Sequence, residues 1–226
     1  MWNLIRVAGH VSSGHAIILH AWMRFAHPRS WRHYMSQAQS ERRLASGWRR
    51  IVEQHRIRVS VLFALVALYF ARPSWDSIML GLPVIAIGEG VRIWASGHIQ
   101  KMAEVTRTGP YSLCRHPLYL GHAFITLGFL LAAANLWLLL AGMVVFLLIF
   151  VPTMDREEGD LVRHFGEEYR QYMQAVPRFI PRFSADLLRG RFDWSLVAKH
   201  REWNNVLGLI GGLIGLVLLG WWRGSL

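Results

Sequence analysis

The stretch LYLGHAFITLGFLLAAANLWLLLAGMVVFLLIFV, residues 118–151, decides the fold of this chain. It consists of two apolar runs, Leu118–Ala134 and Leu136–Val151, that meet at Asn135. Each run is close to the roughly 17 residues that the shortest membrane-spanning helices need. One polar residue between them leaves space only for a tight turn, so we expect a hairpin of two antiparallel helices in a lipid bilayer.

Three further apolar segments flank this hairpin. They are Ile57–Ala71, Ser77–Ala95 and Val206–Trp222. We therefore expect an all-α polytopic integral membrane protein with about five transmembrane helices. The N-terminal stretch Met1–Ala26 mixes arginine and histidine with apolar residues, a pattern that fits either a helix in the membrane interface or a sixth spanning helix.

The chain is both strongly basic and strongly apolar, which is expected if its apolar residues lie in the membrane and its basic residues lie outside it. Of 226 residues 53% are hydrophobic, yet 25 Lys and Arg outnumber 14 Asp and Glu. If all five helices span, the segments 27–58, 99–117 and 153–202 lie on one side and carry 20 of the 25 basic residues. By the positive-inside rule this side is cytoplasmic, and we expect a bacterial-type inner membrane.

Composition also excludes several classes of protein. The apolar content excludes a disordered chain, and the single cysteine, Cys114, excludes a disulfide-built secreted domain. No Cys/His cluster has zinc spacing, so no metal site is expected. Nucleic acid is not an expected partner, because the basic loop has no recognisable binding fold and suits anionic lipid headgroups better.

The last apolar segment is rich in glycine. Between Gly208 and Gly220 several glycines recur four residues apart, a spacing that lets helices pack closely. Packing within one chain and a homodimer through this helix are both compatible with the pattern.

The first concentration of polar chemistry is TGPYSLCRHPLYLG, residues 108–121. Gly109 and Pro110 predict a turn, and Pro117 suits the first turn of a helix. Arg115, His116 and Tyr119 are then expected at the mouth of that helix, where the helix N-terminus favours an anionic group.

The second concentration is DREEGDLVRHFGEEYRQY, residues 155–172, the only acidic cluster in a basic protein. Its carboxylates suit an amine or a cationic cofactor centre. A solvated amphipathic helix is the other interpretation, because Glu167–Arg170 and Asp160–Arg163 have the spacing of helical ion pairs.

Taken together and in this order, the two stretches and the apolar hairpin between them resemble the isoprenylcysteine carboxyl methyltransferase family, which is related to membrane phospholipid methyltransferases. The resemblance covers residues 88–181. It implies an integral membrane enzyme that uses S-adenosylmethionine, in a pocket facing the cytoplasm, to methylate a lipid or lipidated acceptor. It also suggests three parts: an N-terminal region (1–56), a methyltransferase core (57–205) and a C-terminal transmembrane helix (206–226).

The resemblance implies roles for individual residues. The cofactor-binding residues would be Arg115, His116, Tyr119, Gly121, Glu157, Glu158 and Tyr169. Glu167 and Glu168 would lie near the reacting centre as catalytic residues, and Tyr172 would contact the substrate. The family usually has a basic residue where this chain has Ala175, so Arg170 and Arg178 are the nearest candidates to hold an acceptor carboxylate.

Two charged residues lie inside the expected second span. Glu89 and Arg92 are three residues apart, and charges within a membrane are functional candidates because burying them is costly. A structural ion pair and a pair that lines the substrate site are both compatible with this spacing.

The sequence therefore predicts a membrane methyltransferase, with a carboxylate acceptor as the family default. A phospholipid amine and a thiol are the alternative acceptors. An NADPH-dependent membrane reductase with a similar helical core and an inactive membrane scaffold are the rival functions.

Overall fold

The helices form at the predicted apolar runs, and capping residues set their ends. The computed structural model describes residues 58–100, 103–183 and 185–226. Helix α4 (Trp75–Ser96) begins after Ser74, whose hydroxyl accepts a hydrogen bond from the Ser77 amide, while the Ser77 hydroxyl accepts one from the Ser74 amide. This reciprocal capping satisfies two amides at the helix start.

The expected hairpin is formed by α5 (Pro117–Ala132) and α6 (Leu136–Phe165). Pro117 occupies the first position of α5, where a missing N–H costs nothing. The Asn135 side chain accepts hydrogen bonds from the amides of Trp137 and Leu138, at 3.0 and 3.2 Å, and so starts α6.

Helix α6 is much longer than its predicted membrane run, which ended at Val151. It has 30 residues, which is about 45 Å at 1.5 Å per residue, against about 30 Å for the bilayer core. The acidic segment is therefore a continuation of the membrane helix. It ends at Gly166, whose φ of 60° favours glycine, and α7 (Glu167–Ala175) starts there in a new direction.

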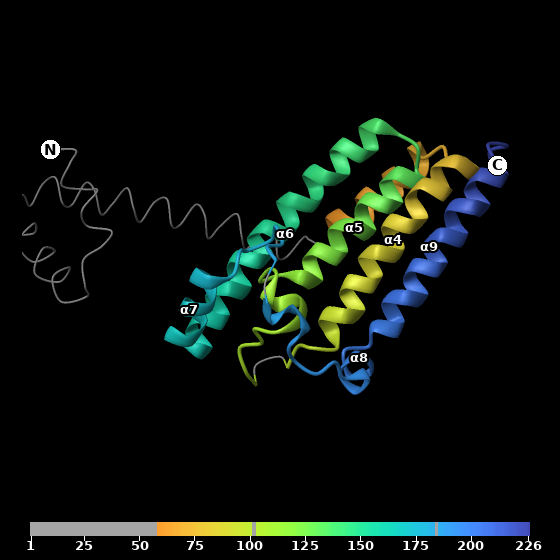
Figure 1. The fold of residues 1–226 in the computed structure, drawn as a ribbon. Coiled ribbons are helices and arrows are strands. Elements are labelled where there is room, and N and C mark those ends of the chain that lie inside the picture. The colour runs from red at the N-terminus through yellow and green to blue at the C-terminus, as the bar shows by residue number, and fades with distance from the viewer. Residues whose placement is uncertain (1–57, 101–102, 184) are drawn as a thin grey trace, which may run out of the picture. The chain divides into compact units, whose positions relative to one another are not determined.

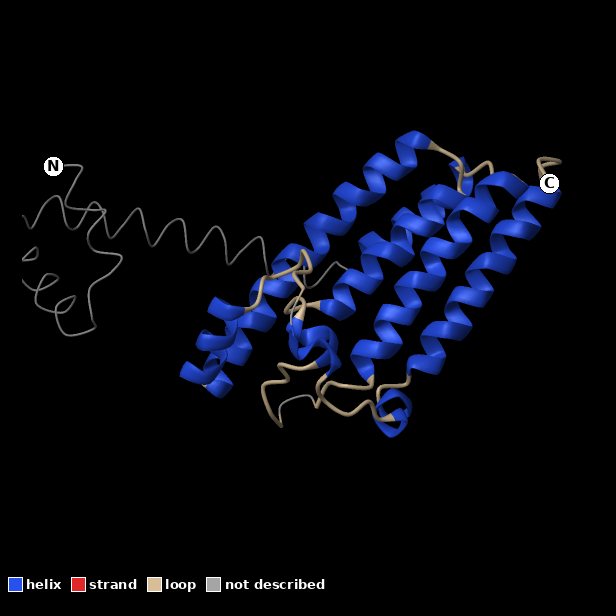
Figure 2. Ribbon diagram, viewed as in Figure 1, coloured by secondary structure: helices blue, strands red, loops and turns tan. Residues whose placement is uncertain are grey.

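Helices α4, α5 and α6 lie side by side with α9 (Glu202–Trp222), as Figures 1 and 2 show. The helix Arg58–Phe70 contributes Phe63 and Ala67 to the apolar core, which includes Ile78, Leu130 and Leu216. The short elements η2 (Gly109–Ser112), η3 (Ala185–Leu188) and α8 (Trp194–Lys199) connect the longer helices. Throughout the described residues the regular structure is helical.

The fold class is confirmed as all-α and membrane-embedded. Helices α4, α6 and α9 are long and apolar enough to cross a membrane, whereas Arg58–Phe70 and α5 are shorter apolar helices. Large apolar side chains point outward, Trp137 and Leu207 being 79% and 66% exposed. An outer surface of this kind belongs in lipid. Residues 1–57 lie outside the described part, so the expected N-terminal interfacial or sixth helix stays a prediction.

Glycines bring α4 and α5 into close contact. A Cβ at Gly88 would lie 2.7 Å from the Gly121 carbonyl oxygen, so only glycine fits there without a shift. On α9, Gly212 lies against Phe129 of α5, whereas a Cβ at Gly208 would meet no atom within 4 Å. Part of the glycine pattern thus serves packing within the chain, and the homodimer stays a prediction.

The segments that connect α4 to α5 and α7 to α9 lie at the same end of the helices (Figure 1). Both polar motifs therefore meet at this end, which is the side that the charge distribution predicts to be cytoplasmic.

Candidate functional site

Backbone hydrogen bonds join the two polar motifs. The amide of Arg115 donates to the Pro177 carbonyl at 2.9 Å, and the amide of His116 donates to the Arg178 carbonyl at 3.2 Å. The amide of Arg182 donates back to the Leu113 carbonyl at 3.0 Å. The chain after α7 thus returns to the segment before α5 and fixes its position.

Glu158 of α6 is the centre of the charged contacts beneath this pairing. Its Oε1 accepts a hydrogen bond from His116 Nε2 at 3.0 Å and lies 3.4 Å from Arg115 Nη2 and from Arg178 Nε. Glu158 is only 8% exposed. A buried carboxylate surrounded by cationic donors is held in its ionised form and orients the His116 ring.

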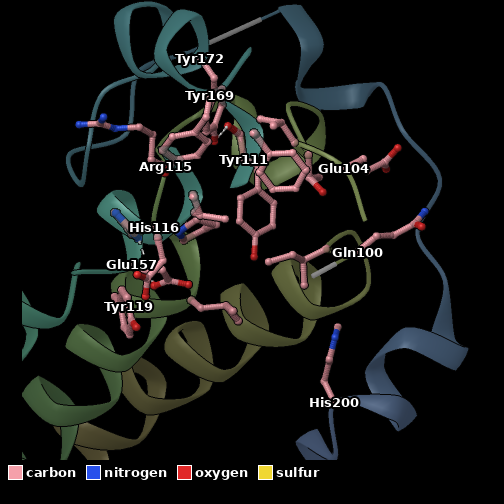
Figure 3. Close-up of a pocket in the computed structure, with 18 of the residues that line it drawn as sticks. Gln100, Glu104, Tyr111, Arg115, His116, Tyr119, Glu157, Tyr169, Tyr172 and His200 are labelled. Atoms are coloured by element: carbon pink, nitrogen blue, oxygen red, sulfur yellow. Dashed lines mark hydrogen bonds and ion pairs between the residues drawn. The ribbon is translucent and has the colours of Figure 1, made fainter. Parts of the chain in front are cut away.

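A cavity of about 660 Å³ opens beside these residues. This volume suits a ligand of cofactor size. Figure 3 shows side chains from α5, α6, α7 and the connecting segments around it. The wall combines aromatic, acidic and basic side chains: Arg92, Glu104, Tyr111, Arg115, His116, Tyr119, His122, Glu157, Asp160, Phe165, Tyr169, Tyr172, His200 and Glu202.

Buried tyrosines form one wall of the cavity. The Tyr172 hydroxyl donates to the Tyr111 carbonyl at 2.7 Å, which connects α7 to η2. Burial raises the pKa of Tyr169, and the nearby Glu158 carboxylate raises it further. Burial likewise raises the pKa of Tyr172. These side chains therefore stay neutral at physiological pH and present aromatic faces that attract a cation.

Cys114 lies within the first motif but is not a nucleophile. It is 1% exposed, and burial raises the pKa of its thiol to about 11. The thiol stays protonated near neutral pH, and a protonated thiol is unreactive.

A second charged group lies between α4, α5 and α9. Arg92 Nη2 donates to Glu202 Oε2 at 2.7 Å, and Arg92 Nε lies 3.7 Å from Glu89 Oε2. Arg92 also contacts His122 of α5. The structure therefore shows the predicted Glu89–Arg92 pair and adds a partner, Glu202, that the sequence reasoning did not identify.

The structure brings most of the predicted site residues together. Seven of them line the cavity: Arg92, Arg115, His116, Tyr119, Glu157, Tyr169 and Tyr172. Glu158 supports this wall through the contacts above. Gly121 packs against Gly88 and Arg92, and Glu89 lies behind Arg92.

The predicted catalytic residues lie elsewhere. Glu167, Glu168 and Arg170 are exposed on α7, where Arg170 contacts Glu167 at 3.3 Å and Glu168 contacts Arg107 at 3.4 Å. Arg178 contacts Asp155 and Glu158. None of the four is among the residues that line the cavity, so their catalytic roles stay predictions that this geometry does not favour.

Several cavity residues were not predicted. Tyr111 lies in the first motif, and its position directly after the Gly109-Pro110 turn was the available signal. Glu202 stands at the start of an apolar helix, where a single carboxylate could have been noticed in the same way as Glu89. Glu104 and His200 belong to connecting segments without a distinctive pattern.

Comparisons with known proteins place the chain among membrane methyltransferases and their relatives. Residues 76–168 match the phospholipid methyltransferase family. The cobalt-zinc-cadmium resistance protein CzcN of Cupriavidus metallidurans is 32% identical over 158 residues, which cover 63% of this chain and 70% of that protein. No solved structure matches the chain.

Two enzymes match a shorter part of the chain. Methanethiol S-methyltransferase 1 of Bradyrhizobium diazoefficiens is 42% identical over 71 residues, 31% of this chain and 24% of that protein. The protein-S-isoprenylcysteine O-methyltransferase of Mus musculus is 35% identical over 77 residues, 33% of this chain and 26% of that protein.

Proposed function

Since this chain belongs to the isoprenylcysteine carboxyl methyltransferase family, which is related to membrane phospholipid methyltransferases, we propose that it transfers a methyl group from S-adenosylmethionine to a membrane-borne acceptor. The observation that carries this proposal is the cavity beside the buried Arg115–His116–Glu158 group at the end of the membrane helices. The cavity faces the cytoplasm in this proposal, because most basic residues belong to that side.

The residues present fit the methyl donor. S-adenosylmethionine supplies a methyl group on a positively charged sulfur and carries an amine, a carboxylate and an adenine ring. Glu157 offers a carboxylate to the amine, and Arg115 at the start of α5 offers a cation to the carboxylate. Tyr169 and Phe165 offer aromatic faces.

Two unpartnered groups support the same fit. The Tyr111 hydroxyl and the Thr106 Oγ1 are buried without a hydrogen-bond partner, and both residues line the cavity. Buried polar groups are rarely left unpaired. Polar atoms of a bound ligand would satisfy both.

The chain's own residues mainly have to orient the reactants and exclude water. Glu158 fixes the His116 ring, and the pairing of residues 113–116 with 177–182 holds that ring at the mouth of α5. Arg92 and His122 belong to membrane helices and also line the cavity. An acceptor that arrives from the bilayer can therefore meet a donor that arrives from the aqueous phase.

The relatives that align over most of the chain are named for metal resistance, including the nickel-cobalt-cadmium resistance protein NccN of Alcaligenes xylosoxydans xylosoxydans. Within the described residues, no group of three or more His, Cys, Asp and Glu side chains is placed to hold a metal ion. The proposal rests on the methyltransferase relatives and on the cavity.

The test is transfer of a labelled methyl group in sealed membrane vesicles. Inverted vesicles that contain the protein should incorporate label from S-adenosylmethionine into extracted lipid, and right-side-out vesicles should not, because the donor does not cross the membrane. A His116→Ala variant should lose most of the label. Detergent-solubilised protein that binds NADPH but not S-adenosylmethionine would instead identify a reductase, and binding of neither would identify a scaffold.

A further inference from the structure

Glu202 is a buried carboxylate on the part of the cavity wall that α4, α5 and α9 form with Arg92, His122 and Glu202, and we call this part the inner end. It is 7% exposed and lines the cavity. Its Oε2 accepts from Arg92 at 2.7 Å, and its Oε1 accepts from the Ser96 hydroxyl at 2.8 Å. Glu202 begins α9, which lies beyond residues 76–168, the part of the chain that matches the phospholipid methyltransferase family.

The charges around Arg92 are unequal. Glu202 and Glu89 both face its guanidinium, so two carboxylates share one cation. The second oxygen of Glu89, Oε1, is buried and has no hydrogen-bond partner. This end of the cavity therefore carries an excess of negative charge when both carboxylates are ionised.

Arg92 is shared between two carboxylates. Among the described residues that line the cavity, Arg115 contacts Glu158, whereas Arg92 contacts both Glu202 and Glu89. An acceptor carboxylate beside Arg92 would therefore be the third carboxylate around one guanidinium. Like charges brought together at a buried site repel one another strongly.

Tyr111 connects this end to the rest of the cavity. Its side chain is 6% exposed, and its hydroxyl has no partner. Burial raises the pKa of Tyr111 well above its ordinary value, and the carboxylates of Glu157 and Glu202 raise it further. Figure 3 shows the Tyr111 side chain among the residues around the cavity.

We propose that Glu202 determines which acceptor the enzyme methylates: its carboxylate occupies Arg92, so that the inner end of the cavity receives an amine in its ammonium form and rejects a carboxylate. The Tyr111 hydroxyl and the Glu202 carboxylate are the groups that face the ammonium. Without the Glu202 charge, Arg92 becomes available to a carboxylate acceptor. This inference rests on the proposed methyltransferase function.

Transfer of the methyl group to the amine nitrogen releases one proton. The ammonium first loses one N–H proton. Its nitrogen lone pair then forms the N–C bond while the S–C bond of the sulfonium breaks and leaves its electron pair on sulfur. Water takes up the released proton.

The test compares acceptors in nanodiscs with labelled S-adenosylmethionine. The amine acceptors are phosphatidylethanolamine and free ethanolamine, and the carboxylate acceptor is N-acetyl-S-farnesylcysteine. Wild-type protein should methylate an amine and give a product that is stable to mild base. If the acceptor is a lipid headgroup, phosphatidylethanolamine should be methylated and free ethanolamine should not. A base-labile ester as the main wild-type product would overturn the inference while still supporting the methyltransferase proposal.

The variants test the role of Glu202 directly. Glu202→Gln should raise the KM for the amine at least tenfold and gain base-labile label on the carboxylate acceptor, with donor Kd changed less than twofold. Glu202→Asp, which keeps the charge, should retain the amine preference, and Asp76→Asn at the opposite end of α4 should change neither.

Failures of the two proposals are distinguishable. An unchanged acceptor preference in Glu202→Gln, measured in protein that still binds the donor, would overturn the inference alone. If Glu202→Gln does not fold, two other results would overturn the inference. One is loss of the amine preference in Glu202→Asp, and the other is an ester as the main product of the wild-type protein. Absence of both donor binding and lipid label in wild-type protein would overturn the methyltransferase proposal itself.

Discussion

Replacing Glu158 by glutamine tests whether its buried carboxylate holds the site together. The substitution keeps the size of the side chain but removes the charge that faces Arg115 and Arg178 at 3.4 Å each. Removing one partner from a buried ion pair costs about 3–5 kcal/mol, because the remaining charge is left without a counter-ion. The side chain is 11% exposed, so solvent screens little of this effect.

The loss of the Glu158 charge should lower both the melting temperature and the affinity for the methyl donor. For a protein of this size it corresponds to a fall in Tm of roughly 6–20 °C, measured by thermal unfolding in detergent. Loss of the oriented His116 contact should also weaken donor binding at least tenfold, or about 1.4 kcal/mol, measured by calorimetry. Asp186→Asn, which removes the carboxylate of the exposed Arg189–Asp186 pair, is the matched control and should change Tm by about 2 °C or less. A Glu158→Gln protein that melts and binds the donor like the control would refute the reasoning.

Three further predictions concern packing and pH. Tyr172→Phe should lower the free energy of unfolding by about 1–3 kcal/mol, because the Tyr111 carbonyl loses its partner; an unchanged Tm would contradict this. Gly88→Ala should destabilise the α4–α5 contact by about 1–3 kcal/mol, whereas Gly90→Ala, with open space around it, should leave the Tm unchanged or raise it. The free energy of unfolding should fall as pH rises from about 9 to 11, because the unfolded chain releases the Cys114 proton while the folded chain retains it. Thermal melting measured across this pH range should show a smaller fall in Cys114→Ala, and an equal fall in the variant would contradict this cause.

The membrane helices were predictable because lipid imposes a simple rule on the sequence. An apolar run of sufficient length becomes a helix, since no other local structure satisfies its backbone in a bilayer. The hairpin at Asn135 followed from this rule, and so did α4 and α9. The family resemblance, drawn from the two polar motifs on either side of the hairpin, is also confirmed.

The length of α6 was not predictable from the same signals. Pro152 normally ends a helix, and the residues after it are polar. The structure continues the helix through Pro152, where the Thr153 hydroxyl donates to the Ile149 carbonyl. The true end is at Gly166, whose positive φ is visible only in the structure.

The cavity was predictable only in part, because its contacts cross long stretches of sequence. His116 and Glu158 are 42 residues apart, and Arg92 and Glu202 are 110 apart. Periodicity reports which face of one helix is buried, but it does not report which helix lies opposite. The resemblance supplied the first pair through the order of the motifs, whereas Glu202 lies outside the resemblance and had no such guide.

The pairing of residues 113–116 with 177–182 also orders events during synthesis. Segment 113–116 before α5 emerges from the ribosome more than 60 residues before its partner. By then the α5–α6 hairpin has been made in full and can already enter the bilayer. Glu202 follows later still, so its part of the cavity wall is completed last. A nascent chain stopped before residue 177 would therefore hold helices α4, α5 and α6 but neither α9 nor an assembled site.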